Sequence, residues 1–181
     1  MPLADINAPK TSRDYLSFRP AIDTDFDILA EMRRDTEMQG LLMTIPDATD
    51  DESVRGWIAR RSQDDSGIFR VIAETETNRA LGYLQITGIH HRNRTGYGGI
   101  AISKRARVPG LGQAAMRHLM AAAANELNLA KLMAEIRIDN FTAIQLNMSA
   151  GYRIVGTLEQ HFRGPTDTYD ALLLERLLGA N

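Results

Sequence analysis

Apolar and polar residues alternate along several short stretches in the first hundred residues of the chain. A period of two is typical of a half-buried β-strand. This pattern predicts strands at residues 17–22, 69–74, 81–86 and 97–102. Between the first two of these strands, one helix is expected at residues 26–32, after the capping residues Asp23 to Asp25, and a second helix at residues 53–59.

Beyond residue 110 the apolar residues recur every three or four positions, which is the spacing of a buried helix face. This spacing predicts a long helix over residues 112–127, followed by a strand at residues 132–138. Asn140 can cap a further helix that Gly151 ends. Two more strands are expected at residues 152–155 and 169–174. Seven strands, of which the later ones alternate with helices, predict an α/β fold with one mixed sheet and helices on both faces.

Length and composition indicate a single globular unit. The chain has 181 residues, of which 44% are hydrophobic and 24% are charged, so it can bury one sizeable core. Residues 1–14 lack periodicity and are expected to form a flexible tail, whereas residues 15–181 are expected to form one domain. No apolar run is long enough to span a membrane and no secretory signal is present, which predicts a cytoplasmic protein with no membrane partner.

Charge and cysteine content narrow the possible chemistry. There are 21 basic and 23 acidic residues, a net charge of −2, so a nucleic-acid partner is not expected. The basic cluster from His90 to Arg94 is interpreted as a solvated turn. The absence of cysteine excludes disulfides, zinc–thiolate sites and a covalent acyl-thiol intermediate. His90 and His91 lack spaced acidic or thiol partners, so no metal site is expected.

The most informative stretch is Arg107-Val108-Pro109-Gly110-Leu111-Gly112, which lies between a predicted strand and the long helix. Glycines let the main chain approach a ligand closely, and a helix N-terminus presents unpaired N–H groups at a positive dipole end. The main-chain amides of Val108, Gly110, Gly112 and Gln113 can bind a phosphate, whereas Pro109 has no N–H group. A tight turn at the start of a helix explains these six residues equally well.

A dinucleotide-binding loop is the competing phosphate site. Residues 110–115 fit the pattern G-x-G-x-x-A, which is weak evidence on its own. In such loops the strand runs directly into the first glycine. Here the basic spacer of residues 103–109 intervenes, and several strands precede the motif. The dinucleotide interpretation is therefore the weaker of the two.

Two blocks of sequence resemble the GNAT superfamily of N-acetyltransferases. Arg107-x-x-Gly110-x-Gly112 resembles the loop of that family that binds the pyrophosphate of acyl-coenzyme A. Asn140-x-x-Ala143-x-x-Leu146, followed by Gly151-Tyr152, resembles the second signature of the family. The order of elements agrees from residue 16 to residue 178. The resemblance implies a twisted, mixed sheet of the GNAT type, and more weakly the branches that acetylate ribosomal-protein N-termini, polyamines or nucleotide-linked amino sugars.

The resemblance also implies roles for particular residues. The strand from Ile100 to Ile102 would hold the pantetheine arm and the acetyl carbonyl through its main chain. Arg107, Val108, Gly110, Leu111, Gly112 and Gln113 would form the pyrophosphate loop. Asn140 would reach the pantetheine where two parallel strands separate, and it can also cap its helix.

The sequence departs from the family pattern at one catalytic position. Family members often have a tyrosine after the leucine of the second signature, where it can protonate the departing thiolate. This chain has Asn147 there. An amide can donate a hydrogen bond to sulfur but has no proton to release. The acid is then a water molecule, or none is needed because a thiolate is already a fair leaving group.

A base is also required, because the attacking amine must lose a proton. The candidates on or beside the predicted central strands are Glu74, Glu135, Glu159 and His161. Glu159 and His161 are preferred because they lie on a segment expected to border the acceptor site. Residues 40–49 and 159–167 are expected to shape that site, and they show no single-sign charge pattern that selects a substrate.

These observations predict an N-acyltransferase that moves an acetyl group from acetyl-coenzyme A to an amine by direct transfer in a ternary complex. The acceptor would be a protein N-terminus, a polyamine or an amino sugar. The alternative is a non-catalytic module or sensor that binds acyl-coenzyme A on the same fold. A homodimer is expected from the leucine-rich terminal strands, in particular Leu172 to Leu174, which resemble exposed edges.

Overall fold

The computed structural model describes residues 15–106 and 108–179, in which seven strands form one sheet. The order across the sheet is β1-β2-β3-β4-β5-β7-β6. All neighbouring strands are antiparallel except β4 and β5, which are parallel. The strands are β1 Leu16–Arg19, β2 Ile68–Glu74, β3 Ala80–His90, β4 Thr95–Ile102, β5 Lys131–Arg137, β6 Arg153–Arg163 and β7 Thr168–Leu177.

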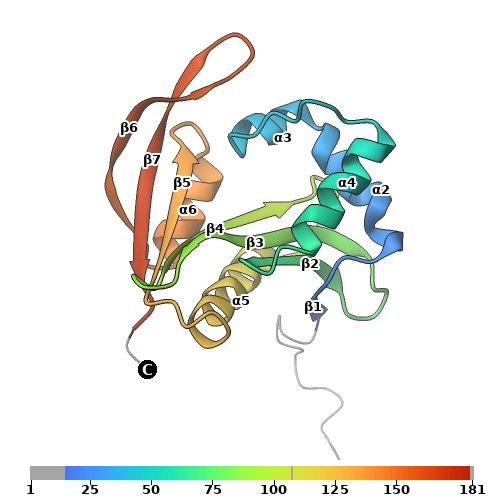
Figure 1. Ribbon diagram of the computed structural model, residues 1–181, viewed down its shortest axis with the longest axis horizontal. Coiled ribbons are helices and arrows are strands. Elements are labelled where there is room, and N and C mark those ends of the chain that lie inside the picture. Colours follow the sequence, from blue (N-terminus) through green and yellow to red (C-terminus); the bar gives the residue numbers. More distant parts are fainter. Residues whose placement is uncertain (1–14, 107, 180–181) are drawn as a thin grey trace, which may run out of the picture.

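Helices cover both faces of this sheet, as the sequence pattern predicts (Figure 1). A 3-10 turn, Asp23–Asp25, leads into α2 Phe26–Arg34, α3 Thr36–Leu41 and α4 Asp51–Ser62, which lie on one side. On the other side lie α5 Leu111–Asn125 and α6 Phe141–Ser149. The mixed sheet and its two helical layers confirm the predicted fold class.

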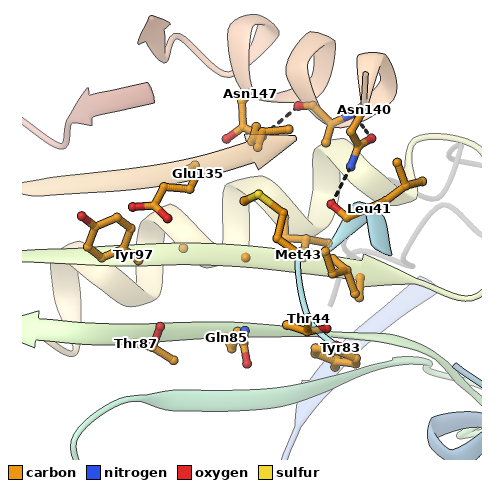
Figure 2. Close-up of a pocket in the computed structure, with 18 of the residues that line it drawn as sticks. Leu41, Met43, Thr44, Tyr83, Gln85, Thr87, Tyr97, Glu135, Asn140 and Asn147 are labelled. Carbon is orange, nitrogen blue, oxygen red and sulfur yellow. Dashed lines mark hydrogen bonds between the residues drawn. The ribbon is translucent and has the colours of Figure 1, made fainter. Parts of the chain in front are cut away.

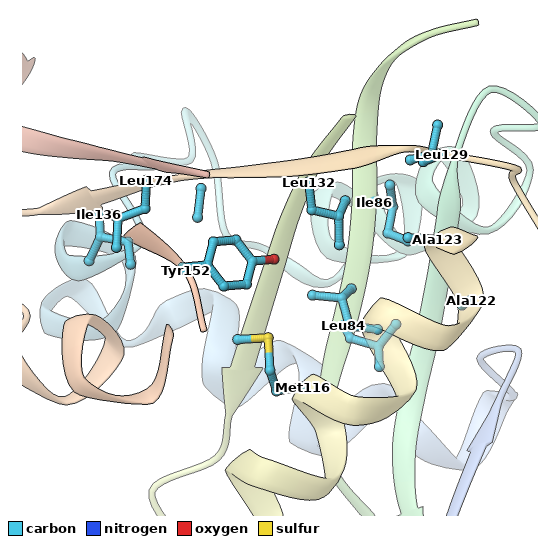
Figure 3. Packing of buried hydrophobic residues seen from close by; sticks show 12 residues of the cluster. Leu84, Ile86, Met116, Ala122, Ala123, Leu129, Leu132, Ile136, Tyr152 and Leu174 are labelled. Atoms are coloured by element: carbon cyan, nitrogen blue, oxygen red, sulfur yellow. The ribbon is translucent and has the colours of Figure 1, made fainter. Parts of the chain in front are cut away.

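Three apolar clusters hold the layers to the sheet, two on the α5 side and one on the α2–α4 side. One of the clusters on the α5 side joins Leu84 and Ile86 of β3, Leu119 of α5 and Leu132 of β5 (Figure 3). Burial raises the pKa of Tyr152, which packs in the same cluster, to about 12. The cluster on the α2–α4 side packs Leu29 of α2 and Trp57 of α4 against β2 and β3. Because the sheet is buried on both faces, its central strands are held rigidly.

The structure corrects the sequence-based boundaries at two places. Residues 36–41 form α3, which the sequence analysis did not predict; Asp35 caps it by accepting a hydrogen bond from the amide of Met38 at 3.0 Å. The strand expected at residues 152–155 extends to Arg163 and forms a long hairpin with β7.

The leucines of the last strand are not at an exposed edge, as the sequence analysis expected. Strand β7 lies between β5 and β6, and its Leu174 is fully buried. The edge strand is β6, where Ile154 and Val155 are exposed. The homodimer stays a prediction. The exposed apolar residues that could form its contact lie on β6 and not on β7.

The parallel pair β4 and β5 separates soon after it begins. In the described structure the two strands pair through three positions, Thr95–Lys131, Gly96–Leu132 and Tyr97–Met133. Beyond Tyr97, the edge of β4 that faces β5 has no partner strand within the described residues. The main-chain groups at that edge are therefore available to a ligand.

A substitution at Gly82 on β3 would test how tightly the centre of the sheet is packed. A Cβ atom at this position would lie 2.9 Å from the Cα atom of Ile102 and closer still to the carbonyl oxygen of Ala101, and neither backbone atom can move easily. We expect Gly82→Ala to lower the free energy of unfolding by about 3 kcal/mol, the upper part of the usual range for overpacking. Urea denaturation measures this change.

Gly156→Ala is the matched control for this prediction, because no atom lies within 4 Å of the added Cβ on the edge strand β6. It should change the free energy of unfolding by less than about 0.5 kcal/mol. Equal effects of the two substitutions would contradict the packing argument.

Candidate active site

A cavity of about 590 Å³ lies where β4 and β5 separate (Figure 2). Its walls come from the middle of β4, from β3 and β5, from the segment Leu41–Thr44 after α3, and from α6. Two predicted acceptor segments contribute: residues 41–44 of the first, and His161 and Phe162 of the second. The cavity reaches both the α5 side and the α2–α4 side of the sheet, so two molecules can meet in it.

Two glycines make the main chain of β4 accessible inside this cavity, because they have no side chains to cover it. Gly98 and Gly99 both line it. Gly98 cannot carry a side chain without disturbance, because a Cβ atom would lie 2.8 Å from Cδ2 of Leu119. Ile100, the first residue of the predicted pantetheine-binding strand, lines the cavity, whereas Ile102 does not.

Two asparagines of α6 face β4 across the cavity (Figure 2). The side-chain oxygen of Asn140 accepts a hydrogen bond from the amide of Ala143 at 3.2 Å, and its Nδ2 donates to the carbonyl of Leu41 at 3.5 Å. It therefore caps α6 and links that helix to α3. Asn147 is buried, and its Nδ2 donates to the carbonyl of Ala143 at 2.9 Å.

The structure brings two of the four candidate bases together. Nε2 of His161 lies 3.0 Å from a carboxylate oxygen of Glu135, and both residues line the cavity. Glu135 is two residues beyond the last β4–β5 pair and stands on the same face as Tyr97 (Figure 2). Glu74 instead forms an ion pair with Arg79. Glu159 is exposed on β6 and does not line the cavity.

A bulge in β6 explains why His161 faces the cavity and Glu159 does not. Leu158 pairs with Ala171 and Phe162 with Tyr169, so residues 159–161 stand opposite Asp170 alone. Gln160 adopts a left-handed conformation with φ of 49°, and a carboxylate oxygen of Asp170 accepts from its amide at 2.8 Å. Bulges commonly redirect a side chain beside a functional site.

The predicted pyrophosphate loop lies at the N-terminus of α5, outside the cavity lining. Gly110 precedes the helix with φ of 74°, a conformation that favours glycine. The amides of Gly112 and Gln113 have no acceptor among the described residues. The side chain of Leu111 is buried, so this residue can contribute only its main chain. Arg107 lies outside the described residues.

The sequence of the chain also matches a family model. The model is described as an acetyltransferase (GNAT) domain, and it matches residues 16–153. The chain belongs to the GNAT acetyltransferase family. The resemblance found in the two sequence blocks is therefore confirmed. No curated protein sequence matches the chain significantly.

Solved structures share the GNAT fold with this chain at low sequence identity. The spermidine N-acetyltransferase from Vibrio cholerae, in complex with CoA and spermine, has a TM-score of 0.82 and 15% identity, over 91% of this chain and 96% of that one. An acetyltransferase of the GNAT family from Bacillus anthracis has a TM-score of 0.75 and 16% identity, over 91% and 95% of the two chains. At these identities the likeness concerns the fold.

Residues 15–106 and 108–179 contain no group of three or more metal-ligating side chains. In the same part of the chain, no helix has both the length and the apolar character needed to cross a membrane.

The α2–α4 end of the cavity contains residues that the sequence analysis did not single out as functional. Arg33 of α2, Arg61 of α4, Trp57 of α4 and Tyr83 of β3 line it. Trp57 and Tyr83 also belong to the apolar cluster beneath α2 and α4. A sequence signal for the arginines is hard to find, since each stands in the last turn of a different helix.

Proposed function

We propose that this GNAT domain transfers an acetyl group from acetyl-coenzyme A to a primary amine, directly, in a ternary complex. The observation that carries the proposal is the cavity at the β4–β5 separation, which has a bare strand edge on one side and the Glu135–His161 pair on the other. The chain contains no cysteine, so the acetyl group cannot be held on a protein thiol.

The residues present fit acetyl-coenzyme A. The unpaired edge of β4 from Gly98 to Ile102 offers main-chain donors and acceptors to the amides of the pantetheine arm. The main-chain amides of Val108, Gly110, Gly112 and Gln113, at the positive end of α5, suit the pyrophosphate. Asn140 lines the cavity as well, within reach of a ligand bound there. A bound molecule would thus extend from the N-terminus of α5 along β4 into the cavity.

In the transfer step the amine nitrogen attacks the acetyl carbonyl carbon, and the bond from that carbon to sulfur breaks with its electron pair passing to sulfur. The amine proton must go to a base. We assign this role to His161, which Glu135 orients through the 3.0 Å hydrogen bond; with Nε2–H donated to the carboxylate, Nδ1 is free to accept the proton. Glu159 is not retained, because it does not line the cavity.

One test separates catalysis from the alternative of a non-catalytic module that binds acyl-coenzyme A. That alternative is favoured by Asn147, which takes the place of the family tyrosine. The purified protein is incubated with acetyl-coenzyme A and a panel of N-terminal peptides, polyamines and amino sugars, and free thiol is measured. Amine-dependent thiol release supports transfer, whereas tight binding of acetyl-coenzyme A without release for any amine supports the module.

Asn147 itself is expected to contribute little to the chemical step. Its amide has no acidic proton, and its Nδ2 already donates to Ala143. We expect Asn147→Ala to change the single-turnover rate by less than about threefold, far below the hundredfold or more that a true general acid provides. Asn147→Tyr should raise the rate modestly or weaken binding by crowding the buried site. A hundredfold loss for Asn147→Ala at unchanged binding would contradict this view.

A further inference from the structure

Two arginines enter the cavity from the α2–α4 side of the sheet. Arg33 lies in the last turn of α2 and Arg61 in the last turn of α4, and both line the cavity and are partly buried. The helices that carry them pack on the face of β2 and β3 where Tyr83 and Trp57 lie. Their guanidinium groups therefore border the space on the acceptor face of the sheet, the face that also carries Glu135.

Neither Arg33 nor Arg61 forms an ion pair with a carboxylate of the described residues, although both side chains are partly buried in the cavity. Seven other arginines do pair with Asp or Glu: Arg19, Arg34, Arg70, Arg79, Arg105, Arg137 and Arg153. Partly buried positive charges without a carboxylate are costly unless a ligand supplies one.

Arg33 is held in a fixed orientation. Its Nη1 donates to Oε1 of the buried Gln39 at 2.9 Å, and its guanidinium lies 5.0 Å from the ring centroid of Trp57. Burial lowers the pKa of Arg33; Tyr83 and Asp47 oppose this effect, and the charges of Arg61 and Arg60 add to it. The remaining guanidinium nitrogens of Arg33 have no hydrogen-bond acceptor among the described residues. Such a group is preorganised to receive an anion.

A structural role at the helix ends does not account for this arrangement. Cations in the last turn of a helix stabilise it through the helix dipole, and Arg34 and Arg60 already occupy the last turns of α2 and α4. Both of these side chains are exposed and outside the cavity lining. Arg33 and Arg61 are instead directed into the cavity, where their mutual repulsion is unfavourable.

We propose that Arg33 and Arg61 form an anion subsite, and that the acceptor is a primary amine that carries a carboxylate or phosphate group. This inference rests on the proposed function, since it names the substrate class of the same site. Bidentate guanidinium contacts suit either anion. The acceptor would place its acidic group between the arginines and its amine toward the Glu135–His161 pair.

The charge of the cavity also disfavours a polyamine. Glu135 is the one acidic side chain among the described residues that line the cavity, and His161 already contacts it. A polycation would meet two unpaired guanidinium groups without compensating carboxylates. Of the acceptor classes considered above, amino sugars with a phosphate fit, whereas a polyamine does not.

Trp57 gives a direct readout of binding that does not depend on turnover. It is the only tryptophan of the 181 residues, and it lies beneath Arg33. Its fluorescence is followed while leucine or leucinamide, glucosamine 6-phosphate or glucosamine, and spermidine are added without acetyl-coenzyme A. In at least one of the two pairs, the acidic member should bind about 10-fold tighter or more than its uncharged twin. The pair that responds distinguishes carboxylate from phosphate.

Arg61→Gln is the decisive variant, because Arg61 makes no hydrogen bond to the described residues and its loss should leave the fold intact. It should remove the preference for the acidic member without changing the affinity for the uncharged twin. Arg60→Gln is the matched control: it carries the same charge change one residue away, on an exposed side chain outside the cavity lining, and it should keep the preference. Arg33→Gln should act like Arg61→Gln.

Thiol release with the same amines and acetyl-coenzyme A separates failure of the subsite from failure of the proposed function. An arginine-dependent preference for the acidic member in the fluorescence assay, without turnover, would support the subsite and count against acetyl transfer. Turnover with no preference for acidic amines, or with spermidine preferred, would overturn the subsite and leave acetyl transfer standing. Equal or absent fluorescence responses for the members of both pairs would also overturn it.

Discussion

His161→Gln is expected to lower the single-turnover rate of acetyl transfer by about 100-fold or more, the usual contribution of a general base. Glutamine keeps approximate size and hydrogen-bonding capacity but cannot accept the amine proton. Binding of acetyl-coenzyme A should be unchanged, because His161 lies on β6, away from the N-terminus of α5. Rapid mixing with one accepted amine measures the rate.

Glu135→Gln and Glu159→Gln form a matched pair of controls for this result. Glu135 contacts His161, so its loss should reduce the rate through misorientation of the imidazole. Glu159 is exposed and outside the cavity lining, and its substitution should have no effect. A larger loss for Glu159→Gln than for Glu135→Gln would refute the assignment of the base.

Gly110→Glu is expected to weaken acetyl-coenzyme A binding by more than about 100-fold, which corresponds to roughly 2.7 kcal/mol. The carboxylate would stand at the amides that we assign to the pyrophosphate, and like charges repel strongly there. The fold should survive, because no atom lies within 4 Å of a Cβ added at this position. Calorimetric titration with acetyl-coenzyme A measures the change.

Gly110→Ala isolates the effect of charge from that of backbone strain. Both substitutions force a side chain into the conformation with φ of 74°, so both carry the same strain of about 1 kcal/mol. Alanine adds no charge, and its effect on binding should be much smaller. If both variants bind acetyl-coenzyme A as the unsubstituted protein does, the phosphates are bound elsewhere.

The sequence was sufficient for the fold, and its local motifs also supplied the candidate residues for the acetyl-donor side of the site. Periodicity located all seven strands and every helix except α3, whose six residues are too few to show a helical repeat. The glycine spacing at residues 110–112 and the Asn140 block were recognisable because a binding loop and a helix cap are local in sequence. Local patterns of this kind can be recognised in a sequence without knowledge of long-range packing.

The acceptor side could not be predicted in the same way, because its residues meet only through tertiary structure. Glu135 and His161 are 26 positions apart, and a bulge in β6 decides which of residues 159–161 faces the cavity. The sequence analysis ranked Glu159 and His161 together because both lie on a segment expected to border the acceptor site, and the sequence gives no sign of the left-handed conformation of Gln160. Arg33 and Arg61 converge because α2 and α4 pack on the same face of the sheet.

Because β4 separates from β5, acceptor selection and proton transfer are assigned to different halves of one sheet. The groups assigned to selection of the acceptor, Arg33 and Arg61, belong to helices over β2 and β3, whereas the groups assigned to chemistry, Glu135 and His161, belong to β5 and β6. Substitutions on α2 and α4 can therefore change which amine is accepted while the proton-transfer machinery stays in place. Such independence lets one scaffold acquire new acceptors by small steps, without passing through an inactive ancestor.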